Sequence, residues 1–413
     1  MNFRADQLLT SWTKLTTPLG HAALQAADSL VAGGATPADL QRELRKSFSD
    51  PELVAATLAQ QDLRTKGVAK FSQAAAQMLF TPTGLEQATR FPVAQHHAAR
   101  LKAHGITKVL DLGAGIGAES LAFAQAGLQV TAVEIDELTA TFAAHNLREY
   151  PNAQVLCQNA LAVDLAEFNT TDSAVFIDPA RRTLGNRNSQ RVHPSDYSPS
   201  LDFVFAVTAT HNTAVKLGPG FDRELIPAHT EAEWVSINSQ ALETLLWSGT
   251  LRTPNITRRA TAFKDNQWQT IAAAADAPDA AVRNLGSYIF EPDPTIIRAR
   301  QIGAIATELS AGMLSPGIAY LTGETQPPTP HPFVASFKVL DVTSLKPKAV
   351  RQALLERGAT SAELKKRGVS ADLQEFRKAL KLPPAKKKDP RLELTVFLTR
   401  IQDKHAAIIA ARV

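Results

Sequence analysis

A glycine-rich turn is the feature of this sequence that most constrains its fold. Residues 109–118 read VLDLGAGIGA, so that Gly113, Gly115 and Gly117 stand between a short apolar run and an Ala-rich segment. Glycines at such positions permit positive φ angles and let a ligand approach the backbone closely. A strand, a glycine turn and a helix in this order predict the first βα unit of a doubly wound α/β domain.

Apolar runs continue to alternate with Ala-rich segments beyond this turn. The later runs QVTAVEI, AQVLC, SAVFIDP, NTAVKLG and EWVSI read as strands. Strands that alternate with helices form parallel sheets whose faces are covered by those helices. The sequence therefore predicts a Rossmann-like α/β domain.

The segments on either side of this domain differ from it in composition. Leu and Ala dominate residues 1–75, where Asp50 and Pro51 provide an N-cap and a first-turn proline. The Pro-rich run QPPTPHP at 326–332 predicts a linker. We therefore expect an N-terminal helical region over 1–75, the α/β domain over 76–328, and a small α+β module over 329–413.

Charge is spread unevenly along the chain. From His331 to Val413 there are 18 Lys and Arg against 8 Asp and Glu, a net charge of +10, while the remainder has 26 against 32, a net charge of −6. This asymmetry favours contact between the C-terminal module and a polyanion. Cys157 is the single cysteine, so no intramolecular disulfide can form, and the N-terminal residues lack the apolar run of a signal peptide. We expect a cytoplasmic protein with no membrane segment and, from the scattered histidines, no metal site.

Polar residues at successive strand ends predict a bound nucleoside. Glu134 ends the second strand, 21 positions after Gly113, where a carboxylate can accept hydrogen bonds from both ribose hydroxyls. Asn159 follows the third strand, at the height of an adenine amino group. The glycine pattern also fits a dinucleotide, but Asp111 would repel a pyrophosphate and suits the positive sulfonium or amino group of S-adenosylmethionine. We expect S-adenosylmethionine to be held by Asp111, Gly113, Gly115, Gly117, Glu134 and Asn159.

The fourth strand ends in the motif FIDPARR, which points to chemistry at the same sheet edge. Asp178 and the carbonyl of Pro179 could accept the two hydrogens of an exocyclic amine and turn its lone pair toward a methyl group. This arrangement is similar to the [D/N]-P-P-[Y/F/W] motif of amino-methylating enzymes, except that Ala180 and Arg181 replace the last two residues. Tyr197, in HPSDYSP, could supply the missing aromatic surface.

Together these motifs resemble the bacterial class I S-adenosylmethionine-dependent methyltransferases that carry a C-terminal THUMP-like domain. The resemblance is carried by MLFTPTGLEQAT, VLDLGAGIGAE, VEID, FIDPARR, PSDYSP, VKLGPG, EAEW, YIFEPD, IAYLTG, ELKKRGV and LTVFLTR. It implies a core that binds S-adenosylmethionine and a basic module similar to RNA-binding THUMP domains. It also implies that Gln87 and Thr89 belong to a segment that closes over the methionine end of the cofactor.

Two groups of consecutive basic residues are candidates for contact with RNA. Arg181 and Arg182 follow the DPA motif, and Lys365, Lys366 and Arg367, which we call the basic cluster, stand together in the C-terminal module. Phosphate contacts supply most sequence-independent affinity for nucleic acids. The leading hypothesis is methylation of a tRNA or rRNA base at an exocyclic amine or ring nitrogen. The alternatives are a small-molecule or protein acceptor, and an RNA-binding protein whose site no longer catalyses.

Overall fold

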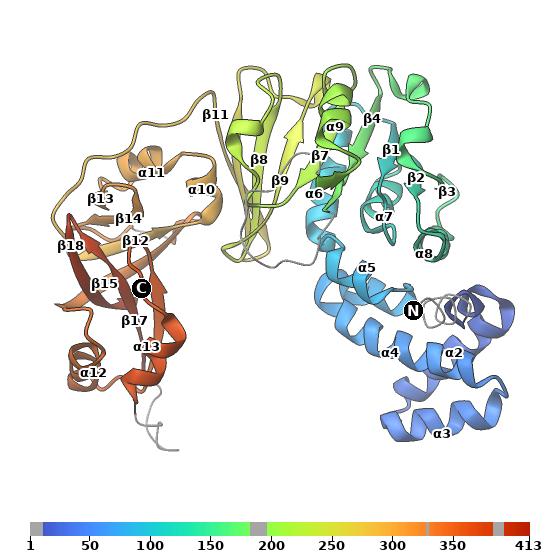
Figure 1. The fold of residues 1–413 in the computed structure, drawn as a ribbon, viewed down its shortest axis with the longest axis horizontal. Coiled ribbons are helices and arrows are strands. Elements are labelled where there is room, and N and C mark those ends of the chain that lie inside the picture. The colour runs from blue at the N-terminus through green and yellow to red at the C-terminus, as the bar shows by residue number, and fades with distance from the viewer. Residues whose placement is uncertain (1–10, 182–195, 328–329, 383–391) are drawn as a thin grey trace. The chain divides into compact units, whose positions relative to one another are not determined.

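The structure is a computed structural model that describes residues 11–181, 196–327, 330–382 and 392–413 (Figure 1). The chain divides into two compact units. The first runs to Leu217 and includes 222–231 and 245–253, and the second comprises 218–221, 232–244 and 254–413. Among the described residues no helix is long and apolar enough to cross a membrane.

The N-terminal part of the first unit is helical, as predicted. Its three longest helices each begin with a proline behind a capping side chain, Thr17, Thr36 or Asp50. Asp50 accepts hydrogen bonds from the first-turn amides of Glu52 and Leu53, so the predicted helix start is confirmed. The elements are η1 (Lys14–Thr16), α2 (Pro18–Ala32), α3 (Pro37–Ser47), α4 (Pro51–Phe71), η2 (Ser72–Gln77) and α5 (Pro82–Gln87).

The predicted Rossmann-like domain is confirmed. Five parallel strands lie in the order β3-β2-β1-β4-β7, and the sheet continues through β9, β8, β10 and β11. The strands are β1 (Lys108–Leu112), β2 (Gln129–Glu134), β3 (Ala153–Cys157), β4 (Ser173–Ile177), β7 (Thr213–Leu217), β8 (Glu231–Ile237), β9 (Gln240–Trp247), β10 (Arg258–Lys264) and β11 (Gln267–Ala273). The helices are α6 (Phe91–Ala103), α7 (Ala118–Gln125), α8 (Glu137–Leu147) and α9 (Leu201–Thr208), with short turns η3 (Ala160–Ala162), η4 (Ala166–Phe168), η6 (Arg223–Leu225) and η7 (Gly249–Leu251).

Burial explains why these strands carry little polarity. Every residue of β4 is buried, and its neighbour β1 is buried from Val109 onward. Strands covered on both faces read as continuous apolar runs rather than alternating ones. The polar residues that interrupt these runs, Asp111 within β1 and Asp178 directly after β4, are therefore exceptions that require a partner.

The C-terminal part of the second unit is built on a seven-stranded sheet (orange to red in Figure 1). Its order is β13-β14-β12-β15-β18-β17-β16, so strands from before and after residue 329 share one sheet. The strands are β12 (Tyr288–Pro292), β13 (Gly312–Ser315), β14 (Ile318–Gly323), β15 (Val334–Thr343), β16 (Ser361–Lys366), β17 (Glu393–Ile401) and β18 (Lys404–Arg412). The helices are α10 (Pro294–Arg298), α11 (Ile302–Glu308), α12 (Pro347–Glu356) and α13 (Leu373–Leu380).

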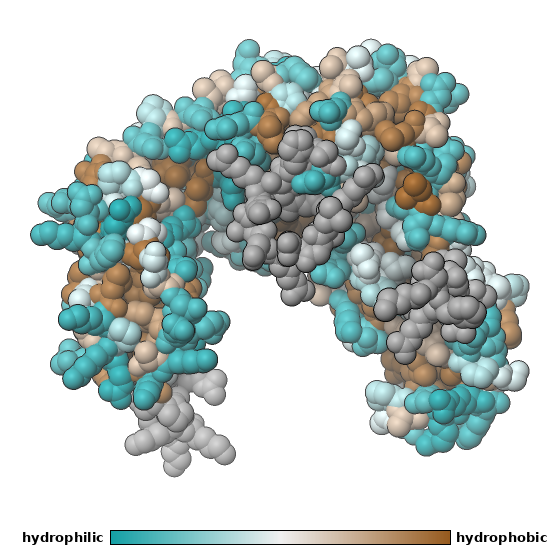
Figure 2. Space-filling view, viewed as in Figure 1, coloured by the Kyte–Doolittle hydropathy of each residue, from teal (hydrophilic) through white to brown (hydrophobic). Residues whose placement is uncertain are grey.

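Two apolar clusters stabilise this sheet. One gathers Val350 and Leu354 of α12 and Phe376 of α13 against β16, β17 and β18. The other packs Tyr320, Phe337 and Phe397, whose rings meet edge to face. Hydrophilic side chains cover much of the visible surface of this part of the chain (Figure 2).

Candidate cofactor and acceptor site

The glycine turn has the backbone conformation that the sequence predicts. Gly113, Gly115 and Gly117 all have positive φ angles, of 83°, 57° and 82°. A Cβ atom on Gly113 would lie 2.8 Å from the carbonyl oxygen of Asp178, whereas one on Gly115 would meet nothing within 4 Å. The turn is therefore packed against the end of β4 at Gly113 and open to a ligand at Gly115.

Glu134 is held beside this turn by two backbone amides. Its Oε2 accepts a hydrogen bond of 2.9 Å from the Gly115 amide, and its Oε1 accepts one of the same length from Asp136. Each carboxylate oxygen has a second lone pair. The half-buried side chain is thus fixed in orientation and can still accept from ribose hydroxyls.

Asn159 also lies where the sequence predicts, after β3. Its side chain is exposed, and its oxygen accepts a hydrogen bond of 3.0 Å from the amide of Leu161, which caps η3. An adenine amino group would share this oxygen with the backbone amide.

Asp111 is buried within β1, with an exposed fraction of 1%. Its Oδ2 accepts a hydrogen bond of 2.5 Å from Ser120, and its Oδ1 has no hydrogen-bond partner among the described residues. Burial raises the pKa of Asp111 to about 7; the negative charges of Glu119 and Asp178 act in the same direction, and the Ser120 hydrogen bond opposes them. A buried carboxylate with an unsatisfied oxygen beside an open glycine turn fits a cationic ligand, such as the amino or sulfonium group of S-adenosylmethionine.

Asp178 lies at the carboxyl end of β4, next to the same turn. Its backbone amide donates to the carbonyl of Leu112 at 3.1 Å, and its side chain is 34% exposed. The ammonium of Lys216, at the end of β7, lies 2.6 Å from Asp178 Oδ2. Asp178 therefore presents a carboxylate at the carboxyl edge of the sheet, beside the cofactor turn.

Lys216 also connects this carboxylate to a buried polar network that sequence reasoning missed. Its ammonium donates to Thr89 Oγ1 at 2.9 Å, and Thr89 is hydrogen-bonded to Glu119. Glu119, in the first turn of α7, lies 3.0 Å from His97 Nδ1 of α6, and both side chains are buried. Burial alone would raise the pKa of Glu119, but the charge of His97 and the hydrogen bonds hold it below its ordinary value.

The segment before α6, predicted to close over the cofactor, is tied down by a second lysine. Lys70 of α4 donates to the carbonyls of Glu86 and Ala88 at 2.6 and 2.7 Å. Thr89 is buried within this segment, whereas Gln87 is exposed at the end of α5.

The other predicted acceptor residues are placed as follows. Pro179 is buried, and Tyr197 is only 5% exposed, in the short strand β6 (Tyr197–Ser198). The backbone of Tyr197 pairs with that of Arg181 in β5 (Ala180–Arg181). Arg182 lies outside the described residues. In this structure little of the Tyr197 ring is accessible to a base.

The basic cluster is tied to the protein rather than fully exposed. Lys365 lies 2.7 Å from Glu291 Oε2, and Arg367 lies 3.8 Å from Glu291 Oε1. Lys366 donates to the carbonyl of Ala371 at 2.7 Å. Burial lowers the pKa of Lys365, but its contacts with Glu291 more than offset this and raise it above the ordinary value. Glu291 of β12 thus offsets part of the positive charge that the sequence predicts to bind RNA.

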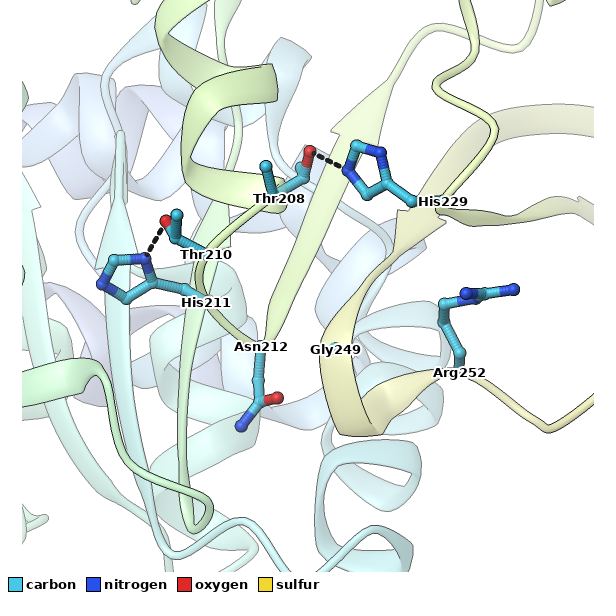
Figure 3. Close-up of a pocket in the computed structure, with 8 residues that line it drawn as sticks. Thr208, Thr210, His211, Asn212, His229, Gly249 and Arg252 are labelled. Atoms are coloured by element: carbon cyan, nitrogen blue, oxygen red, sulfur yellow. Dashed lines mark hydrogen bonds between the residues drawn. The ribbon is translucent and has the colours of Figure 1, made fainter.

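A polar cavity of about 480 Å³ lies at the opposite end of β7, where that strand begins (Figure 3). Four of its side chains are hydrogen-bonded in pairs, Thr208 with His229 at 3.0 Å and Thr210 with His211 at 2.8 Å. The cavity is lined by Thr208, Ala209, Thr210, His211, Asn212, His229, Gly249 and Arg252. Within the described ranges no group of three or more His, Cys, Asp or Glu side chains could hold a metal ion.

The fold and this site define a class I S-adenosylmethionine-dependent methyltransferase. Family models agree with this assignment. Residues 110–179 match a methyltransferase domain, residues 334–412 match a THUMP domain-like family, and residues 6–67 match a domain of unknown function.

Two curated relatives come from Mycobacterium tuberculosis strains CDC 1551 / Oshkosh and ATCC 25618 / H37Rv, and both are named as uncharacterized S-adenosylmethionine-dependent methyltransferases. Each is 31% identical over 369 residues, which cover 87% of this chain and 95% of the relative. A crystal structure from Porphyromonas gingivalis W83, provisionally named as a methyltransferase, has the same fold, with a TM-score of 0.69 and 18% identity over 100% of this chain and 99% of that one. The chain belongs to this family of S-adenosylmethionine-dependent methyltransferases with a C-terminal THUMP-like domain, as the sequence motifs predict.

Proposed function

We propose that this methyltransferase modifies a base of tRNA or rRNA, at an exocyclic amine or a ring nitrogen. The observation that carries the proposal is the position of Asp178: a partly exposed carboxylate at the carboxyl end of β4, whose own backbone packs against Gly113 of the cofactor turn. An acceptor bound to this carboxylate would lie beside the methyl donor.

S-adenosylmethionine, when bound, supplies an electrophilic methyl group on a positive sulfur. In the proposal Gly113, Gly115 and Gly117 line its binding crevice, Glu134 accepts from its ribose, and Asp111 meets a cationic group. Asn159, Gln87 and Thr89 complete this set.

Asp178 and the Pro179 carbonyl would accept hydrogens from the acceptor nitrogen and so direct its lone pair at the methyl carbon. With S-adenosylmethionine bound, the acceptor nitrogen would form the new N–C bond, and the electron pair of the S–C bond would stay on sulfur. The proton carried by nitrogen then leaves to water. Arg181 and Arg182 are proposed to contact a phosphate. The buried Tyr197 ring is not among the proposed contacts with the acceptor base.

An RNA acceptor is supported by the C-terminal part of the chain. The THUMP-like match covers 334–412, and the segment from His331 to Val413 has a net charge of +10. A positive module favours binding to a phosphate backbone, with recognition of RNA shape rather than of sequence. The boundary expected after residue 328 divides the seven-stranded sheet, so the module proposed to bind RNA includes β12, β13 and β14 in addition to 329–413.

Mass spectrometry of modified nucleosides in RNA from a deletion strain tests the proposal. One methylated nucleoside should disappear from the tRNA or rRNA fraction and return when the wild-type gene is restored. The purified protein should then transfer labelled methyl groups to RNA from the deletion strain but not to RNA from the parent. Asp178→Asn should strongly reduce this transfer but leave a measurable residual rate, whereas Asp172→Asn, a change at the other end of β4, should leave the rate unchanged.

A small-molecule or protein acceptor is the second candidate. It is favoured by the contacts of Lys365 and Arg367 with Glu291, which offset charge that RNA would otherwise meet. Intact modified nucleosides in the deletion strain, together with no RNA binding at low salt, would support this candidate. RNA binding without transfer of label would instead indicate a site that no longer catalyses.

A further inference from the structure

We propose that Lys216 is a positioning residue of the methyl-transfer site, which holds Asp178 as an oriented carboxylate facing the acceptor. This inference rests on the proposed function insofar as Asp178 meets the acceptor. Neither the sequence motifs nor the relatives assign a role to Lys216.

The register of the sheet brings the two residues together. β4 and β7 are parallel neighbours in which Ile177 pairs with Val215, so the next residues, Asp178 and Lys216, lie side by side at the carboxyl edge. The Lys216 ammonium lies 2.6 Å from Asp178 Oδ2, and its side chain is only 12% exposed. An ion pair shielded in this way is stronger and better ordered than a surface pair.

Lys216 holds a second group at the same time. Its ammonium donates to Thr89 Oγ1 at 2.9 Å, and Thr89 belongs to the segment that Lys70 fixes through Glu86 and Ala88. One ammonium therefore links the acceptor carboxylate to the segment that the family resemblance places over the cofactor.

The charges around this pair explain why a cation is needed here. Asp111 of β1 and Glu119 of α7 both lie close enough to interact electrostatically with Lys216, and Asp111 also interacts with Asp178. Lys70 adds a second positive charge from α4. Removing Lys216 would take away the ammonium that faces Asp178 Oδ2 and would thereby weaken the charged form of that carboxyl group.

The ion pair also determines what Asp178 can do. A carboxylate stabilised by an adjacent ammonium is a weak base, yet it still accepts hydrogen bonds. Asp178 then orients the acceptor by accepting its N–H, and the proton leaves to water after the methyl group has moved.

Four variants test the inference: Lys216→Met, which keeps the aliphatic stem, Lys216→Arg, Asp178→Asn, and the double variant Lys216→Met with Asp178→Asn. Lys108→Met is the matched control, because Lys108 begins β1 and lies 3.8 Å from Glu167 in a more exposed pair. Transfer of labelled methyl groups to RNA from the deletion strain and calorimetric binding of S-adenosylmethionine are measured for each.

We expect Lys216→Met to lower the transfer rate by about 100-fold, the effect of misplacing a reacting group. We expect its dissociation constant for S-adenosylmethionine to stay within about threefold of wild type, because Lys70 still holds the segment that contains Thr89 and the main loss falls on Asp178. In the Asp178→Asn background the same change should lower the rate less than about threefold. Lys216→Arg should restore part of the rate, and Lys108→Met should leave it unchanged.

Equal losses of rate in both backgrounds, or a parallel loss of cofactor binding, would overturn the inference and leave Lys216 a structural residue. If the wild-type protein methylates no RNA, the proposed function fails, and a second readout then decides the inference. The pKa of Asp178 is measured by NMR of protein labelled with carbon-13 at the aspartate carboxyl groups and assigned by its loss in Asp178→Asn. Lys216→Met should raise that pKa and Lys216→Arg should not; an unchanged pKa would refute the role of Lys216.

Discussion

The buried carboxyl group of Asp111 should release a proton when the cofactor binds. Its pKa in the free protein is about 7, against an ordinary value of 3.8, because burial opposes the charged form. A cation placed against its unsatisfied Oδ1 favours the carboxylate and so lowers this pKa. At pH 6 the free protein has about 0.9 of a proton on Asp111, which is the amount that binding should release.

Calorimetry in two buffers of different ionisation enthalpy measures this release. At pH 6 the apparent binding enthalpy should depend on the buffer more strongly for wild type than for Asp111→Asn, and at pH 8 this difference should nearly vanish. The affinity of wild type relative to Asp111→Asn should rise about tenfold from pH 6 to pH 8 as the carboxylate forms without the ligand. The Asp111→Asn variant is the control, because it retains the shape of the side chain and cannot titrate.

S-adenosylhomocysteine, which lacks the positive sulfur, identifies the group that Asp111 meets. Equal proton release with both ligands would assign Asp111 to the amino group, and a smaller release with the thioether would assign it to the sulfonium. If the apparent binding enthalpies of wild type and Asp111→Asn depended on the buffer to the same extent, the assignment of Asp111 to the cofactor would be refuted.

The same group gives stability a defined pH dependence. A carboxyl group whose pKa is raised on folding stabilises the fold below its unfolded value and loses that effect as the pH rises through its folded value. As the pH rises from about 4 to 7, the contribution of Asp111 should therefore lower the free energy of unfolding by about 4 kcal/mol. The free energy of unfolding is measured by chemical denaturation at several pH values for wild type and Asp111→Asn. The difference between the two should fall by this amount as the pH rises, and a difference that does not change with pH would contradict the prediction.

Three further predictions follow from the contacts of the site. Gly113→Ala should destabilise the fold by about 1–3 kcal/mol more than Gly105→Ala, because both have positive φ but only a Cβ on Gly113 meets a backbone oxygen; equal losses in chemical denaturation would contradict the close packing. Glu134→Ala should weaken S-adenosylmethionine binding by about 1–3 kcal/mol in calorimetry, and an unchanged affinity would exclude Glu134 as the ribose ligand. Neutralising the basic cluster (365–367) should lower the log–log salt slope of RNA binding by at most about one, since Glu291 already pairs with two of its members; a fall of two to three would show that all three bind phosphates.

The elements that sequence predicted correctly are those set by local chemistry. The glycine turn after β1 needs positive φ angles, which glycine adopts most readily, and all three glycines have them. The start of α4 needs a capping side chain followed by proline, and Asp50 and Pro51 supply both. In each case the residues that form the structure are adjacent in the chain.

The basic cluster shows what a local pattern omits. Three consecutive positive residues favour a solvent-exposed surface that attracts phosphates. In the fold, β12 contributes Glu291, which meets both Lys365 and Arg367 across the seven-stranded sheet. Because β12 precedes the Pro-rich run that predicts a linker, no pattern in the sequence places Glu291 in the same sheet as the cluster.

For a related reason, the sequence analysis identified Asp178 of the acceptor site but missed Lys216. Asp178 stands out because it follows a fully buried apolar strand. Lys216 lies within the run VKLG, which by itself indicates only a strand, and its proposed role depends on the register between β4 and β7. A parallel sheet collects the residues that follow its strands at one edge, and here that edge holds Asp178 and, from within β1, the buried Asp111. Carboxylates gathered in this way need a counter-charge unless they are protonated, and Asp111 and Asp178 meet the requirement differently: Asp111 through a raised pKa, Asp178 through Lys216. The neutral Asp111 is then available to become charged against a cationic cofactor, while the charged Asp178 remains an acceptor of hydrogen bonds at the same pH.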